Sequence, residues 1–270
     1  MCFNHNVFNH IQQIIIMIIS ASRRTDMPAF FPKETIDKII SMNNDPQQTL
    51  FKTNIVEGVV FWTKNAHPII PYLHKLDELK IPYYFQYTMN DYPGLEPDIP
   101  SYWNRVKTFI KLSEMLGKHR VIWRYDPFLT STAPVEYTTE DILRRFEFMG
   151  HNICKYTEKL VFSFLDPYDK IPSGLNPPTK KEEEQIINKI LDLCENVWKI
   201  KATTCADPVH NNHIDVNRCI DPNLFKRLGV ELIDPRQKDK SQRKDCWCYP
   251  SVDIGQYHTC KHNCLYCYAK

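Results

Sequence analysis

The chain has 270 residues, 43% of them hydrophobic, with only 7 glycines against 19 prolines. It is long enough to bury the core of one large domain, and its composition gives no sign of disordered linkers. A formal net charge of +2 is too balanced to indicate a nucleic-acid surface or a polybasic membrane patch, so nucleic acid is unsupported as a partner.

The first apolar segment runs from Ile11 to Ile19. It is too short to cross a bilayer, and no basic region precedes it. We therefore expect a cytoplasmic protein with no signal peptide and no membrane partner, in which this segment is a buried first strand.

Short β-rich runs then alternate with helical stretches along the chain. The expected strands are Ile14–Ser20, Gly58–Thr63, Pro82–Thr88, Arg120–Tyr125, Lys159–Phe164 and Ile200–Thr204. The expected helices are Lys33–Met42, Ile69–Leu79, Tyr102–Leu116, Thr139–Cys154 and Thr179–Trp198. In the last of these, Thr179 is a candidate N-cap, with glutamates in the first turn.

Repeated βα units predict an α/β fold with a parallel sheet. An open doubly wound sheet would also fit, but we expect residues 1–206 to form a full or partial (β/α) barrel similar to a TIM barrel. The pattern stops after Asp207, where one short helix candidate, Pro222–Leu228, precedes a charged stretch. Residues 207–270 are expected to be a Cys-rich extension of the same unit, folded over the barrel mouth.

Polar residues follow the strands, and parallel α/β folds place their sites at the carboxyl ends of strands. The candidates for binding a cofactor are Arg23, Arg24, Asp26, Lys64, Arg124 and Asp126. The cations could bind a carboxylate or phosphate, and the aspartates could bind a ribose diol or orient the arginines. Walker loops, Gly-rich dinucleotide fingerprints and His-Glu-x-x-His motifs do not occur in the sequence, which sets those enzyme classes aside.

Ten cysteines without an export signal favour metal or redox chemistry over a disulfide framework. Cys260, Cys264 and Cys267 could hold three irons of a 4Fe-4S cluster and leave the fourth iron open for another ligand. The alternative is a zinc site completed by His258, His262 or another cysteine.

Four further cysteines, at positions 205, 219, 246 and 248, could form a closed site for a second iron–sulfur cluster or for zinc. Their spacing leaves ordinary buried thiols as an equal alternative. Cys2, Cys154 and Cys194 are expected to be ordinary thiols.

The cysteine spacing, with Tyr266 directly before the third cysteine, resembles the radical S-adenosylmethionine (SAM) signature. Five strings resemble domain-of-unknown-function family 1848: Ser20–Asp26, Val60–Asn65, Tyr83–Thr88, Val121–Pro127 and Ser251–Cys260. The match runs from about Ile18 to Ala269 and implies a SAM-type cluster at Cys260, Cys264 and Cys267. It also implies cysteines at the four positions of the second group. Asn263 replaces the usual glycine of the loop, which Asn tolerates because it accepts left-handed backbone angles.

The resemblance implies an enzyme that uses a reduced 4Fe-4S cluster to cleave SAM and form a radical on an unknown substrate. An electron donor such as ferredoxin or flavodoxin would then be a partner. The alternative is a non-catalytic protein that binds zinc or an iron–sulfur cluster for storage or sensing. A nucleic-acid-modifying enzyme is a weaker third option.

Overall fold

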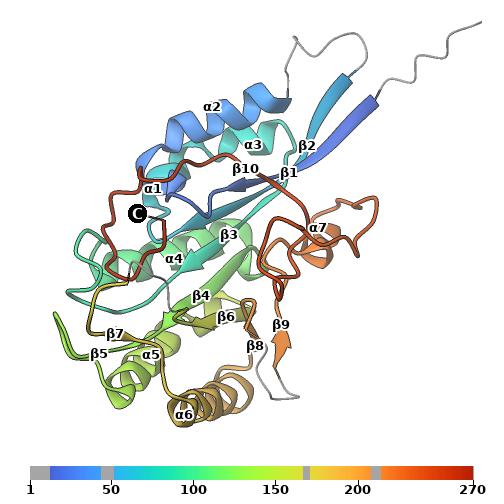
Figure 1. Cartoon of the computed structure of the whole chain (residues 1–270). Coiled ribbons are helices and arrows are strands. Elements are labelled where there is room, and N and C mark those ends of the chain that lie inside the picture. The colour runs from blue at the N-terminus through green and yellow to red at the C-terminus, as the bar shows by residue number, and fades with distance from the viewer. Residues whose placement is uncertain (1–12, 44–51, 167–170, 208–213, 270) are drawn as a thin grey trace, which may run out of the picture.

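The computed structural model describes residues 13–43, 52–166, 171–207 and 214–269. In these ranges eight strands form one sheet in the order β10-β1-β2-β3-β4-β6-β8-β9, and every neighbouring pair in it is parallel (Figure 1). The strands are β1 (Gln13–Ala21), β2 (Lys52–Thr63), β3 (Tyr83–Thr88), β4 (Val121–Phe128), β6 (Lys159–Phe164), β8 (Lys201–Thr204), β9 (Asp215–Val216) and β10 (Val252–Asp253).

The sheet is open, so of the full or partial barrel that we expected, the closed form is wrong. Its two outer strands, β9 and β10, have only two residues each and do not pair with one another. A closed TIM barrel needs eight full-length strands, whereas only six strands of the regular βα pattern are present in the described residues. The confirmed part of the prediction is the α/β class with a large parallel sheet. The division at residue 206 stays a prediction.

All six expected strands are confirmed, with β2 beginning earlier and β4 ending later than expected. The expected strand at the N-terminus is confirmed from Gln13 on, while Ile11 lies outside the described residues. The two-residue strands β9, β10, β5 (Thr130–Ser131) and β7 (Leu175–Asn176) were not predicted, because so few residues show no alternation. The last two pair with each other in a separate antiparallel ribbon.

The expected helices are also present, and the short helix α1 (Met27–Phe30) was not predicted. The others are α2 (Pro32–Asn43), α3 (His74–Glu78), α4 (Tyr102–Leu116), α5 (Thr139–Ile153), α6 (Lys180–Leu191) and α7 (Pro222–Arg227). Thr179 caps α6 in a capping box with Glu182, as predicted, and a π-helical turn, Asp192–Trp198, continues it. The expected helix 69–79 is split into a 3₁₀ helix, His67–Tyr72, and α3, since Pro71 cannot donate a backbone hydrogen bond.

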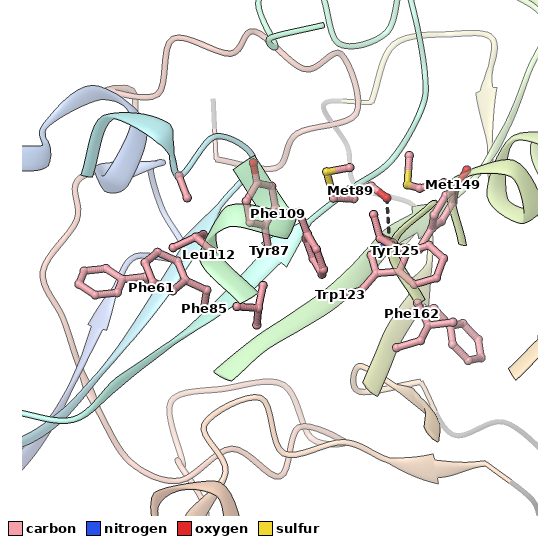
Figure 2. Close-up of a cluster of buried hydrophobic side chains, with 14 of the residues drawn as sticks. Phe61, Phe85, Tyr87, Met89, Phe109, Leu112, Trp123, Tyr125, Met149 and Phe162 are labelled. Atoms are coloured by element: carbon pink, nitrogen blue, oxygen red, sulfur yellow. Dashed lines mark hydrogen bonds between the residues drawn. The ribbon is translucent and has the colours of Figure 1, made fainter. Parts of the chain in front are cut away.

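One face of the sheet packs against the helices. Alternate residues of neighbouring strands, such as Phe61, Phe85 and Trp123, join side chains of α2 to α6 in the larger hydrophobic core. Figure 2 shows its aromatic centre, where Trp123 and Tyr125 of β4 lie among rings and methionines. Among the described helices, none is long and apolar enough to cross a membrane.

The other face packs against the C-terminal part of the chain. Val60 and Tyr84 belong to a second core with Cys219, Phe225 and Cys248. A side chain on Gly58 of β2 would place its Cβ 2.2 Å from the Phe225 ring, so the α7 segment packs directly on the strand backbone. Residues from beyond the βα units therefore cover the face that a closed barrel would enclose.

Candidate functional site

A pocket of about 460 Å³ lies at the carboxyl ends of the strands, a volume typical of small-molecule sites. It is bordered by strand-end residues and by the returning C-terminal segment. All of the predicted site residues line it: Arg23, Arg24, Asp26, Lys64, Arg124, Asp126, Cys205, Cys219, Cys246, Cys248, Cys260, Cys264 and Cys267.

Asp253 connects the C-terminal segment to the end of β1 through strand pairing and hydrogen bonds. Strand β10 pairs with β1 through Ser20 opposite Asp253. The Asp253 carboxylate accepts hydrogen bonds from Ser22 Oγ at 2.6 Å and from the Arg23 backbone N–H at 3.0 Å. Gly255 packs so closely that a Cβ there would lie 2.0 Å from Ser22 Oγ. The cysteine loop that follows is thereby directed to the pocket.

Replacing Asp253 with alanine is expected to destabilise the docked segment by about 1–3 kcal/mol, because the Ser22 hydroxyl and the Arg23 amide lose their acceptor. Hydrogen exchange of residues 254–269 should become faster. Asp215→Ala is the matched control, since the Asp215 side chain is 70% exposed in β9. Equal exchange in the two variants would contradict the role of Asp253.

The cysteine loop places three thiols at the pocket. Cys264 is buried, and burial raises its pKa to about 12, whereas Cys260 and Cys267 are half-buried. Asn263 has a φ of 54°, which confirms the left-handed conformation expected at this position. A thiol with a raised pKa is neutral at pH 7, so a metal binding here must displace its proton.

Asp26 connects this loop to two strand ends. One carboxylate oxygen caps α1 through the Ala29 N–H at 3.1 Å. The other accepts the Lys64 backbone N–H at 2.7 Å and lies 2.8 Å from His262 Nε2. Asp26 therefore has three protein partners, and a zinc site that used His262 Nε2 would have to break the last of these contacts.

Lys64 forms a buried ion pair with Glu96, with a distance of 2.8 Å between Nζ and Oε1. Tyr266 OH lies 2.9 Å from Lys64 Nζ and donates to the Glu96 carboxylate. Burial alone would lower the pKa of Lys64, but the charges of Glu96 and Cys264 and the hydrogen bond with Glu96 together outweigh burial and raise that pKa. Tyr266 of the cysteine motif thus links the cysteine loop to the buried ion pair of Lys64 and Glu96.

The remaining predicted residues differ in their partners. Arg124 is buried on β4 and forms an ion pair with Asp126, which also accepts from Ser163. Arg24 stacks over the Tyr257 ring at 5.2 Å. Within the described ranges Arg24, like Arg23, has no carboxylate partner, so its cation is available to an anionic ligand.

The second group of cysteines meets at the same pocket. Cys219 Sγ lies 3.6 Å from Cys205 Sγ, and the Cys248 side chain is a neighbour of those of Cys219 and Cys246. Among the described residues no three His, Cys, Asp or Glu side chains already have the arrangement of a formed metal site. Cys194, by contrast, belongs to the helical core.

Of the eight buried side-chain polar atoms that lack a hydrogen-bond partner within the part of the chain described, three belong to one region: Arg23 Nη2, Thr25 Oγ1 and Trp62 Nε1. All three residues line the pocket. Such atoms are costly to bury unless a ligand or water satisfies them. They indicate that the pocket is built to hold a polar ligand.

Sequence reasoning missed several residues of the site. It did not include Trp62, whose ring contacts Arg23 and Arg124 at 4.8 and 5.1 Å. Its position directly before Thr63 and Lys64 at a strand end was an available signal. Asp253 lies within one of the family strings, whereas Glu96 lies in a loop with no pattern that marks it.

Comparison with solved structures finds the crystal structures of Streptococcus suis SuiB bound to S-adenosylmethionine and of SuiB bound to the precursor peptide SuiA. They match 81% and 80% of this chain at 12% and 10% identity, with TM-scores of 0.35 and 0.34. The matches cover 46% and 45% of those chains, so this chain spans less than half of their length. Likeness at this level is too low to assign a fold or a function.

A search of curated proteins finds no match. A family model described as "Domain of unknown function (DUF1848)" matches residues 18–269. This range contains both groups of cysteines and every strand-end residue of the pocket. The chain belongs to the DUF1848 family.

Proposed function

We propose that this protein is an iron–sulfur enzyme of radical SAM type. Cys260, Cys264 and Cys267 would bind a 4Fe-4S cluster through three irons, and SAM would occupy the fourth. The observation that carries the proposal is that all three thiols line one pocket together with the polar strand ends. Three-thiolate ligation leaves an open iron, which a purely structural four-thiolate site does not.

The residues present fit such a group in their chemistry. Thiols are the ligands that iron–sulfur clusters use. The pocket also offers the unpartnered hydrogen-bonding atoms of Arg23, Thr25 and Trp62 to a polar ligand beside them. Its volume of about 460 Å³ is adequate for a nucleoside-sized molecule.

When bound, the cluster would supply the electron that cleaves SAM into methionine and a deoxyadenosyl radical, which takes a hydrogen atom from the substrate. The protein's own side chains bind and position. Arg24, whose stacking on Tyr257 leaves its charge available, is our choice for the SAM carboxylate. Lys64 and Asp26 act mainly by holding the cysteine loop, through Tyr266 and His262.

Apolar side chains complete the pocket and exclude water from the reacting atoms. Trp62, Pro127, Phe164 and Leu165 contribute to the lining. A radical is quenched by unintended hydrogen donors, so a site of this kind needs walls that limit access. The proposal names no substrate. For the electron donor, ferredoxin or flavodoxin is our hypothesis.

The test is anaerobic reconstitution with iron and sulfide, followed by reduction in the presence of SAM and chromatography for deoxyadenosine. We expect the wild type to form deoxyadenosine and Cys264→Ala to lose both that product and the iron bound at this site. Cys154→Ala is the control, because Cys154 lies at the end of α5 and outside the pocket. A protein with its cluster in place that leaves SAM intact would refute the proposal.

The alternative is a non-catalytic metal-binding protein. Elemental analysis of protein purified without oxygen separates the two functions. Zinc without sulfide, in amounts that Cys264→Ala lowers, would favour the non-catalytic function. Iron with matching sulfide favours the enzyme.

A further inference from the structure

We infer that Cys205, Cys219, Cys246 and Cys248 form a second metal centre, a closed tetrathiolate site whose net charge of about −2 is offset by Arg23 and partly by Arg124, which also pairs with Asp126. A zinc ion and an oxidised 4Fe-4S cluster share this ligand chemistry and this charge. The inference does not depend on the proposed radical SAM function.

Three separate parts of the chain bring these cysteines together. Cys205 directly follows β8, Cys219 lies between β9 and α7, and Cys246 and Cys248 lie before β10. The Cys219 and Cys205 sulfurs are 3.6 Å apart. Zinc–sulfur bonds of about 2.3 Å place two sulfurs of a tetrahedral site roughly 3.8 Å apart, so this pair already has a suitable separation.

The other two thiols, of Cys246 and Cys248, lie next to this pair. The Cys248 side chain lies between those of Cys219 and Cys246, close enough to both to affect their pKa values. All four side chains face the pocket. On metal binding the four cysteine side chains would have to rearrange around the metal, and such local ordering commonly accompanies metal binding.

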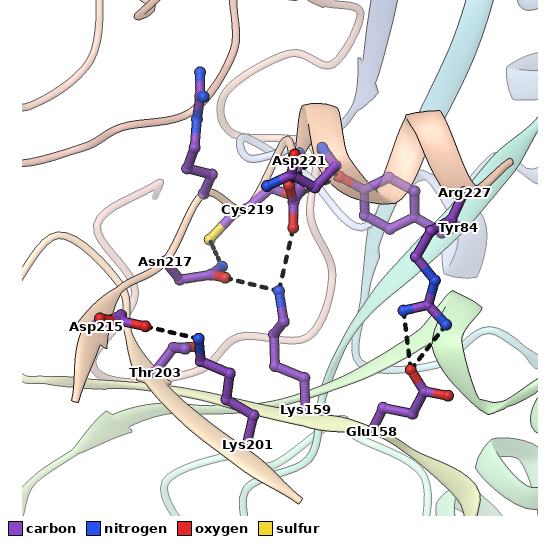
Figure 3. Close-up of polar contacts among 12 residues, drawn as sticks. Tyr84, Glu158, Lys159, Lys201, Thr203, Asp215, Asn217, Cys219, Asp221 and Arg227 are labelled. Atoms are coloured by element: carbon purple, nitrogen blue, oxygen red, sulfur yellow. Dashed lines mark hydrogen bonds and ion pairs between the residues drawn. The ribbon is translucent and has the colours of Figure 1, made fainter. Parts of the chain in front are cut away.

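The Cys219 backbone is held firmly on the sheet (Figure 3). Its carbonyl accepts hydrogen bonds from Tyr84 OH and Gln86 Nε2, both at 2.7 Å. The Asn217 amide donates to Cys219 Sγ at 3.2 Å, while Lys159 Nζ lies 3.2 Å from Asn217 Oδ1. Backbone and side-chain support of this kind positions a metal ligand and orients its sulfur.

Two cations contact the sulfurs. Arg124 Nη1 donates to Cys219 Sγ at 3.0 Å, and the Arg23 side chain lies beside Cys248. Trp62 lies against both guanidinium groups, which fixes them at the site. Within the described residues Arg23 has no carboxylate in ion-pair distance. Since a buried cation needs a negative partner, the cysteine group is the partner that the structure offers it.

Ordinary buried thiols do not have these surroundings. Cys194 is fully buried, and burial raises its pKa to about 12. It packs in the helical core with Trp198 and Ile190. Cysteines kept neutral for packing need no arginines, whereas two arginines on four thiols would be expected around a dianionic centre.

The experiment starts from the Cys260→Ala, Cys264→Ala, Cys267→Ala triple variant, which lacks the first cluster site. Purified without oxygen or reconstituted, it should still bind about one zinc or about four irons with sulfide per chain. Adding Cys219→Ala should abolish this binding, and adding Cys154→Ala instead should not. A folded triple variant that takes up neither metal overturns the inference while leaving the proposed function untouched.

Cobalt titration covers the case in which Cys219→Ala does not fold. Co²⁺ added to the triple variant should give the intense sulfur-to-cobalt absorption of thiolate ligation, and its absence would count against the site. Arg23→Gln should weaken metal binding by about 10–100-fold, with partial recovery in Arg23→Lys, as for residues that support metal ligands. Unchanged affinity in Arg23→Gln would refute the charge-balancing role.

Discussion

Replacing Glu96 with alanine is expected to lower the free energy of unfolding by about 3–5 kcal/mol, because Lys64 would remain buried without its partner. The Glu96 side chain is 3% exposed and that of Lys64 is 16% exposed. Tyr266 would lose the carboxylate to which it donates, so the cysteine loop should loosen as well. Chemical unfolding at pH 7 measures the loss.

Two further variants test the cause. Lys64→Met combined with Glu96→Leu should recover much of the stability, since a well-packed apolar pair can replace a buried ion pair. Asp37→Ala removes one partner of an exposed pair with Lys33 and should have no resolvable effect. If Glu96→Ala and Asp37→Ala were equally mild, the ion pair would not stabilise the fold.

The Glu96 carboxylate also predicts that the stability of the fold depends on pH. Burial would raise the pKa of Glu96, but the charges of Lys64 and Arg105 outweigh it and lower that pKa. A carboxyl group with a lowered pKa stabilises the fold above the ordinary value of about 4.3 and loses that contribution as the pH falls through its folded-state pKa. The stabilities of wild type and Glu96→Gln should therefore differ at pH 7 and converge in acid.

Replacing Trp123 with alanine is expected to cost about 3–5 kcal/mol, as for other large rings in packed cores. Trp123 is fully buried, stacks on Phe146 at 5.2 Å between ring centres and lies 5.7 Å from the Trp198 ring. Its indole N–H donates to the Met89 carbonyl at 3.1 Å, which the substitution would leave without this partner. Thermal or denaturant unfolding measures the loss.

Trp103→Ala is the matched control, because the Trp103 side chain on α4 is 53% exposed. It should change the stability by no more than about 0.5 kcal/mol. A similar loss in both variants would mean that the aromatic centre of the larger core is not what stabilises the sheet.

Much of the fold followed from local patterns. Runs such as Tyr83–Thr88 and Lys159–Phe164 are strands because their side chains can be buried on both faces of a parallel sheet. The α6 helix begins where Thr179 and Glu182 make reciprocal caps. Since parallel strands end at one edge, the strand-end polar residues were expected to share a site, and they all line one pocket.

Barrel closure and the path of the C-terminal segment could not be predicted in this way. Closure depends on whether the outer strands meet, and here β9 and β10 come from irregular segments with no strand pattern. The contacts of Asp253 with Ser22, and of Tyr266 with Glu96, join residues separated by 231 and 170 positions. No local propensity encodes contacts of that range.

The sequence by itself therefore determined the six longer strands, most helices, the family resemblance and the cysteines and strand-end charges of the pocket, because alternation, capping and spacing are local properties. Only the tertiary structure decided that the sheet stays open, that Asp26 and Lys64 are already occupied by protein partners, and that Arg23 and Arg124 contact the second cysteine group. These outcomes depend on which surfaces pack together, since burial forces each charge to find a partner among residues distant in the chain.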